Sequence, residues 1–242
     1  MVKFLIDKLI ADIRRKKYPN PTVKHSCKSY PEVNNWIISE FVTKQVIPLI
    51  KYTPYPIAEI NLMVASICQY KPTHILEWGT NVGKSARIFY ETVKAFSISS
   101  NIISIDLPDD INHSEHPHNQ RGLFVKNLPE VTLLTGDGLD TAIEYLDRVK
   151  SKNLRPLFFL DGDHAYSSVL REISAIARLY PTAAIMIHDT FYQEPGCKYN
   201  VGPHIAVDEI IQKYPKRYYR IETTLGLPGM TVLLPVIRKR TK

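Results

Sequence analysis

The sequence predicts an α/β fold in which a largely parallel sheet carries helices on both faces. From residue 57 onward, strand-like apolar segments alternate with segments that place apolar residues at helical spacing, and this alternation implies right-handed crossovers. Residues 157–160 and 185–187 are apolar throughout, which is typical of central strands. The last two β-like segments are joined by a loop containing residues 225–229. That loop is too short for a helical crossover and predicts an antiparallel hairpin.

The individual elements follow from apolar spacing and from the residues that interrupt it. Pro72 ends the first helix of the alternating region, and an acid followed by two glycines marks the turn after the first strand. The predicted strands are residues 74–78, 101–106, 131–135, 157–160, 184–187, 217–223 and 230–236. The predicted helices are residues 36–47, 57–70, 82–96, 139–150, 167–179 and 205–214.

Residues 1–56 differ from the remainder and are predicted to form an N-terminal helical cap beside a main domain of residues 57–242. Residues 1–17 place Phe4, Leu5 and Leu9 on one face of a short amphipathic helix. Six prolines then break residues 18–56 into short pieces. This part either covers the main domain and contributes to a substrate pocket, or serves as a packing arm or a dimer contact.

The composition indicates a soluble protein of a reducing compartment, and we expect a cytoplasmic location. Three widely spaced cysteines without a CxxC pair argue against a disulfide framework and a cysteine zinc site. The apolar start at Phe4 is soon interrupted by Asp7 and Lys8, so we expect no signal peptide and no membrane span. Much of the formal charge of +7 lies near the two ends of the chain, which favours solvated termini over a nucleic-acid surface.

A glycine loop follows the first predicted strand and contains Glu77, Gly79 and Gly83. Glycines at a strand-to-helix turn permit positive φ and let backbone N–H groups approach a ligand, so the loop predicts a nucleotide-like ligand. The dinucleotide pattern GxGxxG fails because its second glycine would fall at Asn81. The phosphate-loop pattern fails by one residue, although the ending GKS fits. A phosphate-loop protein that uses Asp161 remains an alternative, but Glu77 would oppose a triphosphate.

Four further motifs follow in order on alternating strands. They are residues 102–106 (IISID), 136–138 (GDG), 159–164 (FLDGDH) and 187–190 (IHDT). With the glycine loop, these motifs resemble class I S-adenosylmethionine-dependent methyltransferases over about residues 57–236. More narrowly, they resemble small-molecule O-methyltransferases related to catechol O-methyltransferase and to the cephalosporin-hydroxylase-like group. The resemblance implies a Rossmann-like, doubly wound sheet of seven strands, ending in an antiparallel hairpin, and S-adenosylmethionine as cofactor.

The resemblance places the methionine part of the cofactor at the glycine loop. Gly79 and Gly83 would let the backbone pass beneath it. Its amino and carboxylate groups would contact Glu77, Thr80 and Ser85.

The rest of the cofactor would contact acids at the ends of later strands. Asp106 would accept both ribose hydroxyls in a bidentate contact; a helix cap or loop acid is the structural alternative. The resemblance assigns Gly136 and Asp137 to the neighbourhood of the adenine, with Leu107 packed on its ring. Asp161 would face the sulfonium and the acceptor.

A metal site is implied by acids on two neighbouring strand ends. In metal-dependent members of the family, Asp161 and Asp189 would hold Mg²⁺, with waters completing its octahedron. The ion would coordinate the acceptor hydroxyl and lower its pKa. Catechol-type members have Asn after the second acid, whereas this chain has Thr190, a poorer ligand. The alternative is a mechanism in which His164 or His188 acts as general base.

The acceptor is expected to be a small molecule with a hydroxyl group, such as a phenol, a sugar or a natural-product scaffold. The loop with His113, His116 and His118 lacks the spacing of a zinc site and is expected to be a solvated, substrate-side loop. An RNA methyltransferase remains an alternative because of the net charge, although no RNA-binding module is present. A non-enzymatic cofactor-binding or scaffold protein is a further alternative. A homodimer is expected from the N-terminal helix.

Overall fold

The structure is a computed structural model that describes residues 16–22, 31–111, 117–149, 153–194, 196–223 and 225–236. Most of the helix predicted for residues 1–17 lies outside these residues, as do His113 and His116 of the histidine-containing loop. Within the described part of the chain, no helix is both long and apolar enough to cross a membrane.

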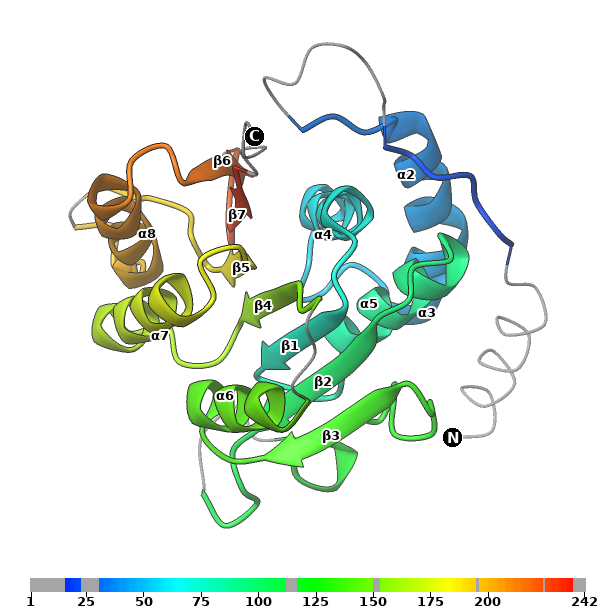
Figure 1. The fold of residues 1–242 in the computed structure, drawn as a ribbon, viewed down its shortest axis with the longest axis horizontal. Coiled ribbons are helices and arrows are strands. Elements are labelled where there is room, and N and C mark those ends of the chain that lie inside the picture. Colours follow the sequence, from blue (N-terminus) through cyan, green and yellow to red (C-terminus); the bar gives the residue numbers. More distant parts are fainter. Residues whose placement is uncertain are drawn as a thin grey trace.

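A seven-stranded sheet forms the centre of the molecule (Figure 1). Its strands are β1 (His74–Trp78), β2 (Asn101–Asp106), β3 (Val131–Thr135), β4 (Pro156–Leu160), β5 (Ala184–His188), β6 (Tyr218–Glu222) and β7 (Met230–Pro235). They lie in the order β3-β2-β1-β4-β5-β7-β6. The first five are parallel, whereas β7 is antiparallel to both β5 and β6. The predicted parallel sheet and terminal hairpin are therefore confirmed.

Helices cover both faces of the sheet. They are α2 (Asn35–Phe41), α3 (Ile47–Ile50), α4 (Ile57–Tyr70), α5 (Lys84–Ala95), α6 (Gly138–Val149), α7 (Tyr166–Leu179) and α8 (Gly202–Lys213). Figure 1 shows α6, α7 and α8 on one face, and α4 and α5 with α2 and α3 behind them on the other. The doubly wound α/β architecture is thus the predicted one.

Two hydrophobic clusters fill the spaces between the sheet and its helices, and β4 contributes to both. Leu157 and Phe159 belong to the cluster under α4 and α5, while Phe158 and Leu160 belong to the cluster under α6, α7 and α8. All four are buried. Alternate residues of one strand therefore pack on opposite faces, which explains why β4 is a continuous apolar run.

The segment predicted as one helix over residues 36–47 is helical but not uniform. α2 starts after Asn34, whose side chain accepts hydrogen bonds from the N–H groups of Trp36 and Ile37. A π-helical turn, η1 (Val42–Val46), then leads into α3, which has Pro48 in its first turn. Proline lacks the N–H group that an α-helical turn would use, and the wider turn accommodates that loss.

This N-terminal segment shares its core with the main domain. Phe41 and Ile50 are buried in the same hydrophobic cluster as residues of α4, α5 and the sheet. The division at residue 56 stays a prediction, and the packing shows that the helical part of this segment, residues 35–50, lies against the domain that it precedes.

The sheet order places the polar loops at one edge. β1 and β4 are neighbours, and the chain winds outward from them in opposite directions, toward β3 on one side and β5 on the other. In open α/β sheets, ligands bind beyond the carboxyl ends of the strands at such a switch point. The glycine loop after β1 and Asp161 after β4 both lie there.

Candidate active site

The glycine loop passes directly against the residue that ends β4. Gly79 has a φ of +93°, and a Cβ atom there would lie 2.1 Å from the carbonyl oxygen of Asp161. Gly83, with a φ of +85°, precedes the first residue of α5. A side chain at residue 79 is therefore excluded by backbone conformation and by space. The predicted loop and Asp161 are neighbours.

Polar side chains beneath the loop form a buried network. Ser104 of β2 donates a hydrogen bond of 2.5 Å to Oε1 of Glu77, and its Oγ lies 2.7 Å from Oγ1 of Thr80. Burial raises the pKa of Glu77 to about 8, against the weaker effect of its hydrogen bonds. Its Oε2 is buried without a hydrogen-bond partner among the described residues. Ser85, in the first turn of α5, is also buried.

Asp106 ends β2 and faces the glycine loop. Its Oδ2 accepts a hydrogen bond of 3.0 Å from the N–H of Asn81, and its Oδ1 accepts one of 2.9 Å from the N–H of Leu107. Arg121 lies 3.5 Å away through Nε and also pairs with Asp109. The carboxylate is thus fixed beside the loop, and its contact with the ribose hydroxyls stays a prediction.

Asp137 stands between β3 and α6. Its Oδ1 accepts a hydrogen bond of 3.0 Å from the N–H of Asp140 in the first turn of α6, and its Oδ2 pairs with Arg171 at 2.9 Å. Gly136 before it has a φ of +148°. The carboxylate therefore fixes the start of α6, and its predicted place beside adenine stays a prediction.

Asp161 is held by side chains from three other parts of the chain. Tyr55, in the loop before α4, donates a hydrogen bond of 2.5 Å to Oδ2. Nδ1 of His188, from the end of β5, lies 2.8 Å from Oδ1, and Nε2 of His164 lies 3.5 Å from the same oxygen. Burial alone would raise the pKa of Asp161, but the two histidines and Tyr55 outweigh it and hold that pKa at about 2.

His188 lies between two carboxylates. Its Nε2 is 3.1 Å from Oε2 of Glu59, in the first turn of α4, and Oε1 of Glu59 accepts a hydrogen bond of 2.9 Å from the N–H of Gly229. Both Glu59 and His188 are buried, at 2% and 4% exposure. Burial would lower the pKa of His188, but Asp161 and Glu59 raise it to about 10.

His164 bridges the ends of β4 and β5. Its Nδ1 lies 3.0 Å from Oδ2 of Asp189. The other oxygen of Asp189, Oδ1, accepts a hydrogen bond of 3.3 Å from the hydroxyl of Tyr199. Nε2 of His164 is buried and makes no hydrogen bond with the described residues. Burial would lower the pKa of His164, but Asp161 and Asp189 raise it above its ordinary value. We call Tyr55, Glu59, Asp161, His164, His188 and Asp189 the Asp161 cluster.

Thr190, predicted as a third metal ligand, points elsewhere. Its hydroxyl accepts a hydrogen bond of 2.9 Å from Thr231 of β7, and its N–H donates to the carbonyl of Gly229 at 3.1 Å. Asp189 has a φ of +56°, so the chain turns sharply between the two residues. The structure brings Asp161, His164, His188 and Asp189 together and directs the Thr190 hydroxyl to the hairpin.

Two members of the cluster were not predicted in these roles. From the sequence, Tyr55 is expected only as one of several aromatic residues that line an acceptor pocket or form an ordinary apolar rim, and nothing singles out Glu59. An acid in the first turn of an otherwise apolar helix is the sequence signal that Glu59 offers, but such acids also favour helix N-termini on their own. The sequence does not show which strand end that turn meets.

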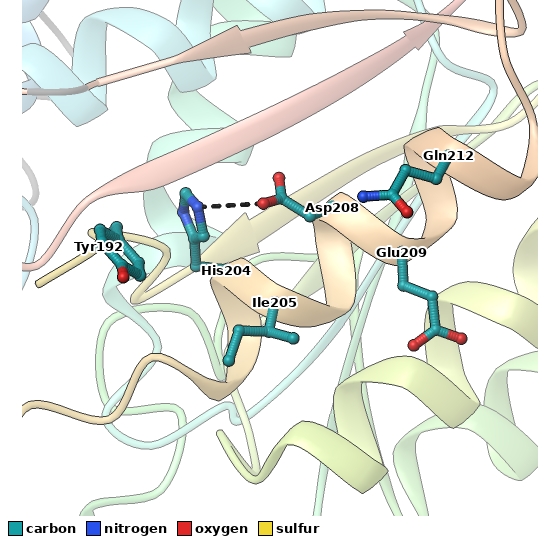
Figure 2. Close-up of a pocket in the computed structure, with 6 residues that line it drawn as sticks. All are labelled: Tyr192, His204, Ile205, Asp208, Glu209 and Gln212. Carbon is teal, nitrogen blue, oxygen red and sulfur yellow. Dashed lines mark ion pairs between the residues drawn. The ribbon is translucent and has the colours of Figure 1, made fainter. Parts of the chain in front are cut away.

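A separate hollow of about 500 Å³ lies beside α8 (Figure 2). Tyr192 and Ile205 give it apolar walls, while Asp208, Glu209 and Gln212 line it with polar groups. His204 stacks near Tyr192, with ring centroids 5.1 Å apart, and its Nδ1 lies 3.0 Å from the carbonyl oxygen of Thr190. The hollow therefore connects through one residue to Asp189 of the cluster.

The sheet order, the glycine loop after β1 and the acids at the ends of β2, β4 and β5 define a class I S-adenosylmethionine-dependent methyltransferase. A family model described as Rhamnosyl O-methyltransferase/CmcI matches residues 42–228, and the chain belongs to this family. The protein is an S-adenosylmethionine-dependent O-methyltransferase that acts on a hydroxyl of a small molecule, as predicted.

Solved structures share this fold at low sequence identity. The SAH-bound methyltransferase PaMTH1 of Podospora anserina is 16% identical over 96% of each chain, with a TM-score of 0.52. The SAH-bound O-methyltransferase of Bacillus cereus is 15% identical over 95% of this chain and 97% of that one, with a TM-score of 0.50. CalS11, a TDP-rhamnose 3'-O-methyltransferase of calicheamicin biosynthesis, is 15% identical over 81% of this chain and 86% of its own, with a TM-score of 0.51. No curated protein sequence matches the chain.

Proposed function

We propose that the acceptor is a sugar hydroxyl, free or carried on a larger small molecule, and that it reacts at the Asp161 cluster. The family description names a rhamnosyl acceptor, and CalS11 methylates TDP-rhamnose. The observation that carries the proposal is the contact between Gly79 and the backbone of Asp161. Because the glycine loop and the cluster adjoin, a cofactor at the loop would present its methyl group to a hydroxyl at Asp161.

The residues of the loop fit the methionine end of the cofactor. Gly79 lets the loop lie directly against the backbone of Asp161, and the buried Oε2 of Glu77 has no hydrogen-bond partner within the described part of the chain. Asp106, fixed by two N–H groups, retains lone pairs for ribose hydroxyls. S-adenosylmethionine carries the methyl group on a sulfonium sulfur. The methyl group would pass to the acceptor oxygen by in-line displacement.

His164 is the better placed of the two histidines predicted as base. His188 has a carboxylate on each ring nitrogen, so neither nitrogen faces an acceptor freely. The side chain of His164 is 29% exposed, against 5% for His188, and when its Nδ1 donates to Asp189, Nε2 keeps a lone pair that makes no hydrogen bond with the described residues. In the absence of a metal ion, His164 takes the hydroxyl proton while the oxygen bonds to the methyl carbon. The electron pair of the broken carbon–sulfur bond stays on sulfur.

A divalent ion is also compatible with the cluster. Mg²⁺, predicted from Asp161 and Asp189, would bind through their carboxylate oxygens. The cluster is suitable in charge, because it contains the carboxylates of Glu59, Asp161 and Asp189 and, among the described residues, no lysine or arginine is paired with them. A bound ion would lower the pKa of the acceptor hydroxyl.

The hollow beside α8 provides room for the remainder of a sugar acceptor. The Tyr192 side chain is 44% exposed, and an aromatic face suits the apolar face of a sugar ring. Glu209 and Gln212 line the same hollow and can accept hydrogen bonds from hydroxyl groups. The loop that carries Tyr192 continues directly from Thr190, which links the hollow to the reacting centre.

Calorimetric titration with S-adenosylhomocysteine and ATP, followed by transfer assays with labelled cofactor, tests the proposal. We expect binding of S-adenosylhomocysteine without ATP binding, and methylation of nucleotide-activated or glycoside-bound deoxysugars. The Asp161→Asn variant should bind the cofactor but lose turnover. Unchanged turnover in that variant would remove the cluster from the reaction, and activity on phenols alone would contradict the sugar assignment.

A further inference from the structure

Asp161, His164 and His188 arrange their ligand atoms as a metal centre does. Oδ1 of Asp161 lies 2.8 Å from Nδ1 of His188 and 3.5 Å from Nε2 of His164, and one ligand atom from each of the three lies within 4.8 Å of the others. Two ligands at right angles, each about 2.1 Å from an ion, are about 3 Å apart. One ion can therefore contact all three atoms after small side-chain movements.

Each imidazole is also held from behind by a carboxylate. Nε2 of His188 lies 3.1 Å from Glu59, and Nδ1 of His164 lies 3.0 Å from Asp189. Histidines that bind metals characteristically donate their second N–H group to a carboxylate or carbonyl, which fixes the tautomer and the ring orientation. The same arrangement occurs twice here, and in both cases the nitrogen opposite the carboxylate faces Asp161.

Glu59 itself is fixed on its far side. Its second oxygen accepts a hydrogen bond of 2.9 Å from the N–H of Gly229, at the start of β7. A buried carboxylate costs free energy unless its oxygens are paired, and here both are paired. A carboxylate fixed in this way can hold the His188 ring in one orientation.

Nε2 of His164 is the atom that these contacts leave unexplained. It is buried, makes no hydrogen bond within the described part of the chain, and lies near Oδ1 of Asp161 without hydrogen-bond geometry. A buried nitrogen whose nearest partner is a carboxylate oxygen 3.5 Å away is poorly satisfied, and a cation between His164, His188 and Asp161 would satisfy it.

We infer that Asp161, His164 and His188 form a metal centre for a divalent first-row transition ion rather than Mg²⁺, with Glu59 and Asp189 orienting the two histidines. The inference rests on the proposed function, because it replaces the base role of His164 with a ligand role. Mg²⁺ prefers oxygen ligands, whereas imidazole suits Mn²⁺, Fe²⁺, Co²⁺ and Zn²⁺. Two imidazoles and one carboxylate with open positions leave room for the acceptor hydroxyl.

Cobalt titration of chelator-treated, full-length protein tests the inference without any activity measurement. We expect one Co²⁺ per chain, visible d–d absorption and displacement by Zn²⁺, with Mg²⁺ failing to compete. His164→Ala and His188→Ala should each abolish the absorption. Glu59→Gln, which keeps the shape but removes the charge, should weaken binding about 10- to 100-fold.

His204→Ala is the matched control, because His204 also has a carbonyl oxygen on one nitrogen and a carboxylate near the other, yet lies outside the cluster. It should bind Co²⁺ as the parent chain does. The S-adenosylhomocysteine affinity of every variant shows whether it is folded, and His164→Ala, at a less buried position, serves if His188→Ala fails to fold.

Equal affinity for Mg²⁺ and Co²⁺, or Co²⁺ binding that survives both histidine substitutions, would overturn the inference. So would the absence of metal binding by protein that still binds S-adenosylhomocysteine and turns over. That last result would leave the proposed function intact, with His164 as base and His188 as a cation between Asp161 and Glu59. Loss of cofactor binding by the parent chain would instead contradict the proposed function.

Discussion

A Cβ atom at residue 79 would lie 2.1 Å from the carbonyl oxygen of Asp161, so the loop after β1 and the end of β4 meet at a position where only glycine fits. That contact joins the two halves of the site. It brings the glycine loop against the Asp161 cluster, and any side chain at residue 79 would force the two apart.

Substitution of Gly79 by Ala should therefore affect both stability and cofactor binding. We expect at least about 1–3 kcal/mol of destabilisation from the positive φ, with a further cost from the clash, and loss of S-adenosylhomocysteine affinity. Gly196→Ala, with a φ of +101° and open space around it, should show conformational strain alone. Gly226→Ala, with neither feature, should be nearly neutral. Denaturant unfolding and calorimetry of the three variants check this order.

Removing the charge of Asp106 should selectively weaken binding of the cofactor. Asp106→Asn is expected to lower S-adenosylhomocysteine affinity about 10- to 100-fold, because hydrogen bonds to charged groups contribute about 1.5–3 kcal/mol. Asp109 pairs with the same arginine but is 77% exposed in its side chain, so Asp109→Asn controls for the loss of an Arg121 partner. Similar losses in both variants would assign the effect to Arg121 rather than to ribose binding.

The His164→Ala variant should bind the cofactor normally and turn over slowly. A positioned general base contributes about 10²- to 10⁴-fold, and loss of a metal ligand would also remove activation of the hydroxyl. Single-turnover assays at saturating cofactor measure the effect, and added imidazole should restore part of the rate. Full activity of this variant would exclude both roles for His164.

Glu172 should make stability depend on pH near neutrality. Burial on α7 raises its pKa to about 7, above the value of about 4.3 in an unfolded chain. Because the folded-state pKa is the higher one, the associated stability is complete below about pH 4.3 and is lost as the pH rises through 7. Between pH 5 and pH 8 the parent protein should therefore lose roughly 1–3 kcal/mol of its free energy of unfolding through Glu172, and the Glu172→Gln variant should not show this loss. Parallel pH profiles for both proteins would contradict the assignment.

Tyr192→Ala should raise the KM for the acceptor and leave cofactor affinity unchanged. The aromatic wall of the hollow is expected to contact the sugar ring but not the reacting atoms. Initial-rate kinetics with varied acceptor separate KM from kcat. An equal fall in kcat at saturating acceptor would place Tyr192 closer to the chemistry than the hollow suggests.

The sequence predicted the fold well because apolar runs and their interruptions encode the elements locally. All seven strands lie within about two residues of their predicted ranges, and α4 ends where Pro72 requires. The helix over residues 36–47 shows the limit of such reasoning. Apolar spacing indicated a helix there, but not the π-helical turn of η1 before Pro48.

The sequence was enough to predict which acids and histidines belong to the site, but not which contacts they make with one another and with Tyr55 and Glu59. Asp161, His164, His188 and Asp189 follow consecutive central strands, so parallel topology alone brings them to one edge. Tyr55 and Glu59 reach the same edge through the packing of α4 against the sheet, which no local pattern specifies. The direction of the Thr190 hydroxyl depends on the left-handed conformation of Asp189. The presence of an aspartate in the sequence is not enough to predict that conformation.

The hydrogen bond between Glu59 and Gly229 joins residues 170 positions apart in the chain. All five sequence motifs lie between them, yet neither Glu59 nor Gly229 belongs to a motif. A shortened homologue that begins at β1 could keep every motif and still be unable to assemble the reacting centre. A chain can therefore carry every motif and still lack Glu59, the residue in the first turn of α4 that contacts His188 of the Asp161 cluster.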